Sequence, residues 1–413
     1  MDRIDLEIID LTTEGKGLAK KDQLTYFVDG AKLGQKVLAQ PTDYKKNYCL
    51  AKTLEILDES PYIQEALCPY ANICDGCNFQ DIVYERQLEF KKSTIINSIN
   101  RIAREQLEDI DFEKGPQRYN YRNKIELKVS PFGHLSYFSR KTNDHLAIKE
   151  CLIANPKINA IISLLQDLIY QYEIRGYEGR KNHGLLKSVT IRSTNIGQSM
   201  LVLVFNEEKN LQEFYKDLEA SKLVDSLYTC VNSKKNNYKI TRPRHVFGLE
   251  KILESMGDKS FLISAKSFFQ VNTDQAYKIY SDVKTIIQEI RPSLLIDLYS
   301  GISTTSIILS DAVDKIISVE LLADAVKDAK ENASLNKVSN IDFMQGDAGQ
   351  IINKLDLSKE DSMLLVDPPR KGLDPNIISQ IGNSSINQLA YISCNPSTLA
   401  RDIKEFKNYG FKL

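Results

Sequence analysis

The strongest constraint on the fold is a regular alternation of apolar runs with helical segments, from about residue 261 onward. Each run ends in polar or small residues, and five can be identified: LLIDLYSG, KIISVE, IDFMQGDA, SMLLVDPPR and LAYISCNP. The clearest intervening helix is predicted over 321–335. Strands that alternate with helices form a parallel, doubly wound sheet. We therefore predict an α/β domain over 261–413, with functional side chains at the carboxyl ends of its strands.

Length and charge narrow the class of protein. The 413 residues suggest two to three domains at roughly 100–200 residues each. The 54 Lys and Arg residues nearly balance 55 Asp and Glu residues, which excludes a histone-like polycation but not a local basic patch. No apolar run approaches the ~18 residues of a membrane span. The N-terminal MDRIDLEIID lacks the apolar core of a secretory signal. We expect a cytoplasmic protein.

The first part of the chain, residues 1–57, reads as short strands. The run TYFVDGAKLGQKVLAQ alternates in polarity and carries Gly30 and Gly34 at expected turns, which predicts a small β-barrel. Lys45 and Lys46 are candidates for a one-sided patch that binds nucleic acid. A solvated charged surface explains them equally well.

The middle part, residues 58–260, is predicted to be an α+β domain. Helices are expected over 81–102 and 158–172, and KIELKVS, LKSVTIRS and SMLVLVF are predicted strands. Basic residues here stand beside aromatic ones, and in RNA-binding proteins aromatic rings stack on bases while Lys and Arg bind phosphates. A solvated basic face is the alternative. The residues concerned are Arg118, Tyr119, Tyr121, Arg122, Lys124, Arg140, Lys141, Arg180, Lys181, Lys234, Lys235, Lys239, Arg242, Arg244 and Lys251.

Three cysteines are clustered in the segment CPYANICDGC. Cys68, Cys74 and Cys77 form a C-x5-C-x2-C pattern, which suits one soft metal centre. A closed site needs a fourth ligand, and Cys151 is the nearest candidate. Zinc and an iron–sulfur cluster both accept four cysteines, so the spacing does not choose between them. The isolated cysteines are interpreted as small buried hydrophobic residues: Cys49 and Cys230.

Acidic residues at the strand ends predict a ligand that contains adenosine. Gly301 follows the first predicted strand, and Glu320 ends the second, 23 residues after Asp297. An acid at about this offset accepts hydrogen bonds from ribose hydroxyls. Asp347 is expected near the adenine ring. No phosphate-binding glycine motif is present, which favours S-adenosylmethionine over a dinucleotide. The alternative for Glu320 is a solvated acid at the end of a strand.

The last two predicted strands carry the expected reactive groups. Asp367 ends the fourth strand in VDPPR, where two prolines fix a rigid turn. Cys394 ends the fifth strand, immediately before a helix expected to begin near Pro396. Because the N-terminus of a helix stabilises a thiolate, Cys394 is predicted to be a nucleophile rather than a buried structural residue.

Four motifs identify a resemblance that covers essentially the whole chain. The segments SFFQVNT (267–273), DLYSGIST (297–304), DPPRKGLD (367–374) and SCNPSTLARD (393–402) closely resemble those of S-adenosylmethionine-dependent RNA 5-methyluridine methyltransferases. The combination of SCNP with FFQVN is highly specific. The cysteine pattern and the N-terminal region resemble the branch that modifies 23S ribosomal RNA and carries a TRAM domain and a [4Fe-4S] cluster.

The resemblance implies an architecture and a set of roles. It implies a TRAM/OB-like β-barrel (1–57), a central RNA-binding domain with an iron–sulfur cluster (58–260) and a Rossmann-like class I methyltransferase domain (261–413). Cys394 would attack C6 of a flipped uridine in 23S rRNA, and C5 would then take the methyl group. The remaining positions fall into two groups: Gln270, Tyr299, Glu320 and Asp367 in the cofactor site, and Cys68, Cys74, Cys77 and Cys151 on the cluster. Gln270 and Asp367 would also contact the uracil edge. A monomer is expected, and zinc is the less favoured metal.

The sequence departs from the family pattern in two places. Ser300 and Ser303 stand where the family usually has Cys and Gly, and Ser303 is expected to crowd the cofactor loop. The sequence ends at Leu413, and no residue matches the Glu that acts as general base in the family. The fifth strand would then be an exposed edge. We expect a truncated chain or gene, or a defective family member.

Other classes of protein share some of these sequence features. Radical methylthiotransferases combine TRAM domains with clusters but use C-x3-C-x2-C, which is absent. Amino-methyltransferases would not need Cys394, and RNA 5-methylcytosine methyltransferases place their cysteines differently. The principal alternative is a catalytically incomplete RNA-binding protein with a structural metal cluster.

Overall fold

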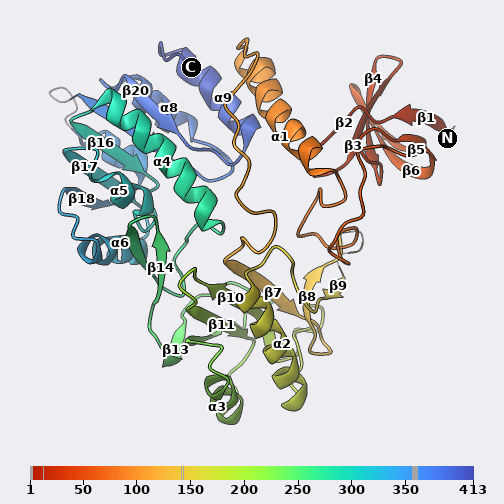
Figure 1. Cartoon of the computed structure of the whole chain (residues 1–413), viewed down its shortest axis with the longest axis vertical. Helices are drawn as coiled ribbons and strands as arrows, with labels where there is room; N and C mark the ends of the chain where they lie inside the picture. The colour runs from red at the N-terminus through yellow and green to blue at the C-terminus, as the bar shows by residue number, and fades with distance from the viewer. Residues whose placement is uncertain (1–2, 13, 141, 143, 356–360) are drawn as a thin grey trace. The chain divides into compact units, whose positions relative to one another are not determined.

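The computed structural model describes residues 3–12, 14–140, 142, 144–355 and 361–413. Lys141, one of the basic residues above, lies outside this description. The chain divides into two compact units (Figure 1). The first comprises Met1–Asn97, Glu108–Lys114 and Tyr137–Leu146, and the second comprises Ser98–Leu107, Gly115–Ser136 and Ala147–Leu413.

The first unit begins with a six-stranded sheet of order β1-β5-β6-β4-β3-β2. The two outermost strands, β1 and β2, are separated in sequence by Ile8 and Ile9 alone, and the Ile9 N–H donates to the carbonyl of Leu18 on β3 at 2.9 Å. The sheet therefore closes on itself around a core that includes Val28 and Val37. The expected short strands are confirmed: β1 (Ile4–Glu7), β2 (Asp10–Leu11), β3 (Gly17–Lys21), β4 (Leu24–Asp29), β5 (Lys36–Tyr44) and β6 (Tyr48–Asp58).

A helix predicted over 81–102 forms as α1 (Tyr84–Ser98) and continues into a π-helical turn, η1 (Ile99–Ala103). The turn ends where Arg104 adopts a left-handed conformation. Beyond it, the Asn100 side chain exchanges two hydrogen bonds of 2.8 Å with the main chain of Leu107. These bonds join the two ends of the segment 98–107, which belongs to the second unit.

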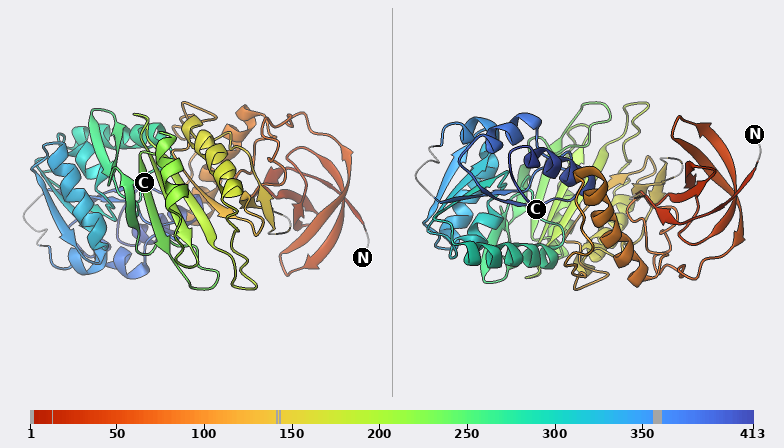
Figure 2. Two further views of the ribbon diagram at one scale, coloured as in Figure 1. Left: turned by 90° about the horizontal axis from the view of Figure 1, so that it is seen from below. Right: turned by 90° about the horizontal axis from the view of Figure 1, so that it is seen from above.

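The central sheet of the second unit has the order β13-β12-β11-β10-β7-β8-β9. Every residue of β10 is buried because β10 is flanked by β7 and β11. The helices α2 (Pro156–Gln171) and α3 (Gln212–Ala220) lie on one face of this sheet (Figure 2). The strands are β7 (Lys124–Val129), β8 (Leu135–Phe138), β9 (His145–Ala147), β10 (Leu186–Ser193), β11 (Ser199–Phe205), β12 (Ser226–Val231) and β13 (Arg244–Gly248).

The predicted parallel sheet is confirmed, with the order β18-β17-β16-β19-β20. The hairpin of β14 (Ile252–Met256) and β15 (Lys259–Ile263) precedes it. Its strands are β16 (Leu294–Leu298), β17 (Lys315–Glu320), β18 (Ile341–Gln345), β19 (Ser362–Val366) and β20 (Gln388–Tyr391). Its helices are α4 (Thr273–Ile290), α5 (Thr304–Leu309), α6 (Ala323–Leu335), α7 (Ala348–Ile352), α8 (Pro375–Gly382) and α9 (Pro396–Lys407).

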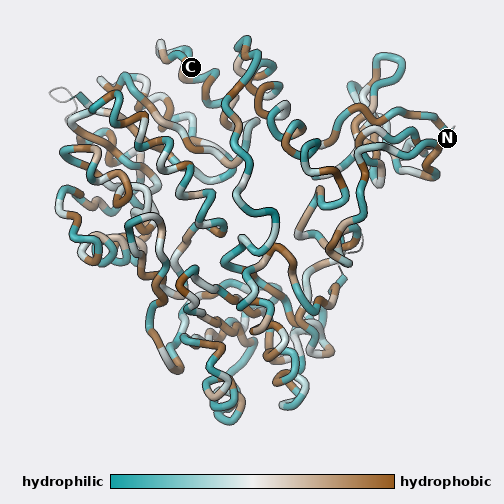
Figure 3. Tube along the Cα trace, viewed as in Figure 1, coloured by the Kyte–Doolittle hydropathy of each residue, from teal (hydrophilic) through white to brown (hydrophobic). Residues whose placement is uncertain are grey.

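Two apolar cores sandwich this sheet because successive strand residues point to opposite faces. Leu295 belongs to the core shared with α4 and α5, whereas its neighbours Leu294 and Ile296 belong to the core shared with α8. The helices mix polar and apolar residues along the chain, as expected when one side is buried (Figure 3). The sheet is thus the middle of three layers.

The strand order places the functional edge. From β16 the chain moves outward through β17 to β18, whereas β19 and β20 lie on the other side of β16. In doubly wound sheets, ligands bind where the order reverses, outside the carboxyl ends of the strands. That point lies between β16 and β19. No helix among the described residues is both long and apolar enough to cross a membrane.

Candidate active site

The loop that follows β16 has an unusual backbone. Tyr299, Gly301 and Ser303 all adopt positive φ values, of 64°, 58° and 58°. This region suits glycine but costs a residue with a side chain about 1–3 kcal/mol. A Cβ atom added at Gly301 would meet nothing within 4 Å, so the space beside this residue is open. The loop therefore combines strain with an open side, as expected of a ligand-binding loop.

Three serine hydroxyls connect this loop to β17. The Ser318 hydroxyl donates to the Ser300 hydroxyl at 2.8 Å, and the Ser303 and Ser318 hydroxyls are 2.7 Å apart. Ser303 and Ser318 are buried. Ser303 is the first residue before α5 and has a left-handed conformation, which explains physically why glycine is favoured there. Its hydroxyl offsets part of the strain by binding Ser318.

Glu320, at the end of β17, also binds the loop. One carboxylate oxygen accepts from the Gly301 N–H at 3.0 Å, and the other accepts from the Leu322 N–H at 2.9 Å. Asp347 is exposed and accepts from the Gln350 N–H at 3.2 Å, which makes it the N-cap of α7. Both acids therefore have structural bonds, and both keep acceptor capacity for a ligand.

Burial raises the pKa of acids at the reversal point. Asp297 is fully buried, its pKa is raised to about 7, and it accepts from the Ser306 hydroxyl at 2.5 Å. Asp367 follows β19, and burial raises its pKa to about 6. The charge of Asp367 further raises the pKa of Asp297. Two acids close enough to interact thus lie at the ends of the neighbouring strands β16 and β19.

Tyr280 was not predicted from the sequence, yet it connects two predicted site residues. Burial raises the pKa of Tyr280 to about 12, while hydrogen bonds with the side chains of Thr305 and Gln270 oppose that rise. The Asp367 charge also acts on its hydroxyl. Gln270 therefore binds the Tyr280 phenol, and the Asp367 carboxylate lies within electrostatic range of it. Tyr280 lies inside α4, where its apolar spacing makes it look like an ordinary core residue.

Tyr299 lies on the other side of the loop. It packs against the core that contains α8, and burial raises its pKa to about 12. The next contribution to this rise comes from the charge of Asp347. The Asp347 carboxylate is therefore within electrostatic range of the Tyr299 hydroxyl.

Cys394 is exposed in the loop between β20 and α9. The Ile392 N–H donates to the Val366 carbonyl at 2.9 Å, so the loops that carry Asp367 and Cys394 leave adjacent parallel strands side by side. The Asn395 side chain caps α9 by accepting from the Ser397 N–H at 3.1 Å. The thiol therefore lies one residue before a capped helix N-terminus.

A buried acid holds the Asp367 loop against α9. Asp402 is fully buried and accepts from the Leu373 N–H at 2.8 Å, from the Tyr391 hydroxyl at 2.7 Å and from the Arg401 guanidinium. Arg401 in turn donates to the carbonyls of Lys371 and Leu373. Asp402 and Arg401 are part of the quoted motif SCNPSTLARD, but the sequence did not indicate this clamp.

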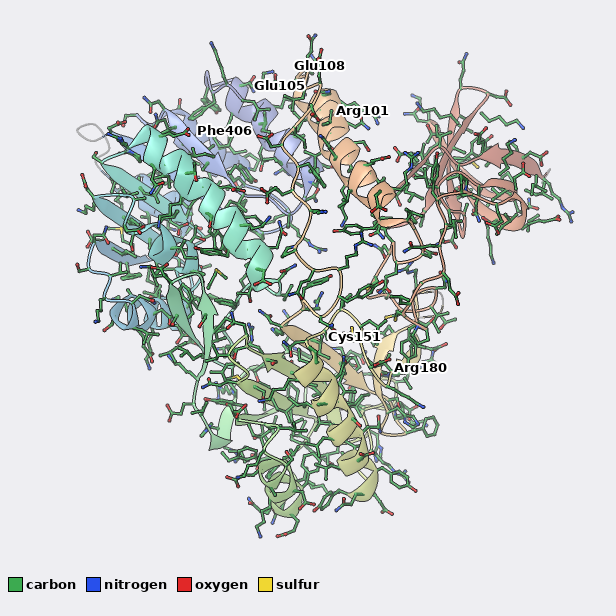
Figure 4. All side chains as sticks on the ribbon, viewed as in Figure 1. Arg101, Glu105, Glu108, Cys151, Arg180 and Phe406 are labelled. Carbon is green, nitrogen blue, oxygen red and sulfur yellow. The ribbon has the colours of Figure 1, made fainter. Side chains whose placement is uncertain are left out.

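The distal end of α9 is fixed as well. Phe406 packs into the core beside α8, and the Lys407 ammonium binds the carboxylate of Glu105 at 2.6 Å (Figure 4). It also donates to the carbonyl of Ala103 at 3.3 Å. The helix behind Cys394 is therefore secured at both ends.

Asn123 connects the central sheet to the segment that carries Gln270. Its main-chain N–H donates to Val271 O at 2.9 Å, and its side-chain amide donates to Gln270 O at 2.9 Å and to the Thr273 hydroxyl at 3.0 Å. Its carbonyl accepts from the Ser193 N–H at 2.9 Å. Asn123 lies inside the basic and aromatic run 118–124, where it carried no signal of its own.

Comparisons with known proteins identify the family. Residues 83–410 match the family described as tRNA (Uracil-5-)-methyltransferase. The chain belongs to this family. An uncharacterized RNA methyltransferase of Halalkalibacterium halodurans is 31% identical over 423 residues, covering 100% of this chain and 92% of that one. A second, from Bacillus cereus, is 32% identical over 425 residues, covering 99% and 92%.

A solved structure supports the fold. The Pyrococcus abyssi tRNA (uracil-54, C5)-methyltransferase, solved in complex with S-adenosyl-L-homocysteine, superposes with a TM-score of 0.78. It is 23% identical, and the match covers 97% of this chain and 93% of that one. The protein is thus an S-adenosylmethionine-dependent RNA 5-methyluridine methyltransferase.

The four cysteines predicted to bind a metal in this uracil-5-methyltransferase fall in different units of the structure. Cys68, Cys74 and Cys77 belong to the first unit and Cys151 to the second. The Gly76 N–H donates to the Cys74 sulfur at 3.3 Å, and Arg140 donates to the carbonyls of Cys74 and Cys77. Within the described part of the chain, no three His, Cys, Asp or Glu side chains are grouped as a metal site. The four-cysteine cluster stays a prediction. Cys49 and Cys230 are buried, as expected.

Proposed function

We propose that the protein methylates C5 of a uridine in 23S ribosomal RNA through a covalent bond between Cys394 and C6. The observation that carries this proposal is an exposed thiol at the carboxyl edge of β20, one residue before a capped helix and beside the loop of Asp367. The attacking species is the thiolate, formed when the Cys394 thiol loses its proton.

The proposed reaction forms and later breaks a bond between Cys394 and the uracil ring. The Cys394 sulfur bonds to C6 and pushes the C5=C6 electron pair through C5 to the O4 carbonyl. S-adenosylmethionine would supply the methyl group: C5 would bond to the methyl carbon as the bond from that carbon to the sulfonium sulfur breaks, which would leave S-adenosylhomocysteine. A base removes the proton left on C5, the double bond reforms, and the sulfur–C6 bond breaks to release Cys394. Gln270, which binds Tyr280, and Asp367 are the proposed contacts to the uracil edge.

The loop after β16 fits a nucleoside cofactor. Glu320 keeps free lone pairs for ribose hydroxyls, Gly301 leaves open space, and Tyr299 and Asp347 lie within electrostatic reach of one another. We assign Tyr299, Glu320 and Asp347 to the cofactor site on this basis, and Gln270 and Asp367 on the sequence resemblance. Their contribution is to orient the cofactor, because the polar atoms are already held by the fold.

We also propose that Cys68, Cys74, Cys77 and Cys151 hold a [4Fe-4S] cluster, with zinc as the alternative. The N–H to sulfur bond at Cys74 and the positive charge of Arg140 beside the loop both favour thiolate sulfur. Cys74→Ser should remove the visible absorbance of anaerobically purified protein. Zinc in place of iron in elemental analysis would contradict the cluster.

The remaining assignments rest on sequence resemblance. We propose a TRAM-like RNA-binding barrel over 1–57, a central RNA-binding domain over 58–260 and a methyltransferase domain over 261–413. The 23S substrate would be tested by incubating undermethylated 23S rRNA and tRNA with enzyme and cofactor. 5-Methyluridine formed in tRNA alone would contradict the 23S assignment.

Trapping the covalent intermediate tests the proposed mechanism. The protein is incubated with S-adenosylmethionine and ribosomal RNA and resolved on a denaturing gel, beside Cys394→Ala and the control Cys230→Ala. We expect a protein–RNA band, or 5-methyluridine in the RNA, with the parent and the control and neither with Cys394→Ala. Methylation by Cys394→Ala would exclude this nucleophile.

A further inference from the structure

A buried lysine in the central sheet has no acidic partner among the described residues. Lys187 on β10 is fully buried, and its ammonium donates to the main-chain carbonyls of Asn232 at 2.7 Å, Lys234 at 2.8 Å and Asn237 at 3.4 Å. The ring of Tyr177 lies 4.2 Å from the same nitrogen. Burying a charge without a counter-charge is costly, so the carbonyls and the ring must compensate for the lost water.

These carbonyls belong to one loop, residues 232–241, which we call the strap. The Ser188 hydroxyl donates to the carbonyl of Tyr238 at 3.3 Å, and the Asn232 amide donates to the carbonyl of Lys239 at 3.0 Å. The Tyr177 hydroxyl accepts from the Asn236 N–H at 3.2 Å. The next residue after Lys239, Ile240, packs against a core that includes Met200 and Val202 of the central sheet. The strap is therefore a fixed structure.

The outer surface of the strap is basic. Lys234, Lys235 and Lys239 are exposed, and Arg180 is exposed on the neighbouring loop, whose Gly179 lies against Asn236 (Figure 4). Over the described ranges, none of these four cations forms an ion pair within 4.0 Å. A nearby acid, Glu178, is already paired with Lys181 at 3.2 Å. The fold thus fixes a group of unpaired cations in place, which a merely solvated face would not require.

We infer that the strap, together with Arg180, is a docking surface for the sugar–phosphate backbone of the substrate RNA, held in shape by Lys187. RNA is favoured over an acidic protein because the chain belongs to an RNA methyltransferase family and the patch carries charge without an apolar centre. The surface deepens the proposed function and rests on it. Lys187 is a positioning residue, since its ammonium faces main-chain carbonyls.

The test compares two triple variants that lose the same charge. Lys234→Ala/Lys235→Ala/Lys239→Ala removes strap cations, whereas Lys216→Ala/Lys284→Ala/Lys315→Ala removes lysines already paired with Glu213, Asp311 and Asp342. The probe is a labelled single-stranded fragment of ribosomal RNA, and its affinity is measured across a salt series. S-Adenosylhomocysteine binding serves as the control for folding.

For the strap variant, we expect the slope of log affinity against log salt to fall by about 2, at about 0.7 per lost phosphate contact. The control should keep the parent slope, and both should bind S-adenosylhomocysteine as the parent does. Equal slopes in all three proteins would overturn the proposal. Polyglutamate serves as a second probe that stands for an acidic protein. If the strap variant loses polyglutamate binding while its RNA binding is unchanged, the proposal is overturned in favour of a protein partner.

Lys187→Met tests the positioning role. Methionine keeps the volume and apolar stem of the lysine but lacks the ammonium that binds the strap carbonyls. We therefore expect faster hydrogen exchange over 232–241 and a smaller slope of log affinity against log salt, with S-adenosylhomocysteine binding retained. Parent exchange and a parent slope would exclude this role. Methyl transfer by the parent to ribosomal RNA is assayed alongside. Its absence would refute the proposed function, whereas a refuted docking surface would leave methyl transfer intact.

Discussion

The two loops at the functional edge of the parallel sheet are held in different ways. The loop after β16 is fixed by neutral hydroxyls and by the carboxylate of Glu320, and it bears backbone strain at Tyr299 and Ser303. The loop after β19 is held by the buried carboxylate of Asp402. Neutral hydrogen bonds are each worth about 1 kcal/mol, whereas a buried charge is costly to leave unpaired. Substitutions in the first loop should therefore change stability by small amounts, whereas loss of Asp402 should disrupt the second loop as a whole.

The largest expected effect is the loss of the Asp402 carboxylate. Asp402→Ala leaves the Arg401 charge, the Tyr391 hydroxyl and the Leu373 N–H without their acceptor. Arg401 is partly exposed and keeps its two carbonyl partners, so most of the cost comes from the Leu373 N–H and the Tyr391 hydroxyl, at about 1–3 kcal/mol each. We expect a total loss of about 2–5 kcal/mol in the free energy of unfolding, measured with urea, and a loss of methyl transfer. Asp374→Ala, which removes the N-cap of α8, should cost only about 1 kcal/mol. Equal costs would show that Asp402 is an ordinary cap.

The buried acid Asp297 should give a pH dependence of stability. Its folded pKa of about 7 exceeds its unfolded value, so its contribution is fully present below about pH 4 and is lost as the pH rises through about 7. In the parent, the free energy of unfolding should fall as the pH rises between these limits. Asp297→Asn should make this fall less steep by up to about 1.4 kcal/mol per pH unit. Urea unfolding at several pH values measures this. Asp342→Asn, at an exposed ion pair, should keep the parent profile; an identical profile for Asp297→Asn would contradict the burial argument.

Removing the middle hydroxyl of the serine chain should have a smaller effect. Ser318→Ala breaks the bonds to both Ser300 and Ser303, and we expect a loss of about 1–2 kcal/mol in stability. Because the loop becomes less ordered, the KM for S-adenosylmethionine should rise while kcat stays near its parent value. Ser310→Ala removes a buried hydroxyl that binds only within its own turn, so it should leave KM unchanged. A change in kcat alone would argue against a role in cofactor binding.

The smallest effect is expected at Ser303. Ser303→Gly relieves a left-handed backbone worth about 1 kcal/mol but loses one hydrogen bond of similar value, so the stability should change little. Ser303→Ala keeps the strain and loses the bond, and it should be destabilised by about 1 kcal/mol. Thermal unfolding of the pair separates strain from hydrogen bonding. If both variants are equally stable, the backbone at Ser303 is not strained.

The fold was largely predictable because its signal is local. The five apolar runs became β16 to β20, and 158–172 became α2 with a shift of two residues at the start and one at the end. The order of strands in the sheet required the structure, since periodicity does not record which runs are neighbours.

The site was predictable only where chemistry marks a residue. Cys394 and Asp367 stand at strand ends beside prolines, and the sequence motifs around them are distinctive. Tyr280 and Asp402 were missed because one resembles a core residue and the other a surface helix residue. Their roles depend on long-range contacts, with Thr305 and with Leu373, that no local pattern encodes.

The bonds around Asn123 have a mechanical consequence. This one residue donates hydrogen bonds to the main-chain carbonyls of Gln270 and Val271, and its own carbonyl accepts a hydrogen bond from β10. Because these hydrogen bonds hold Asn123 from both sides, the two segments that it joins cannot move independently. A displacement of β7 would therefore be transmitted directly to the main chain at Gln270 and Val271, without an intervening side chain from another element.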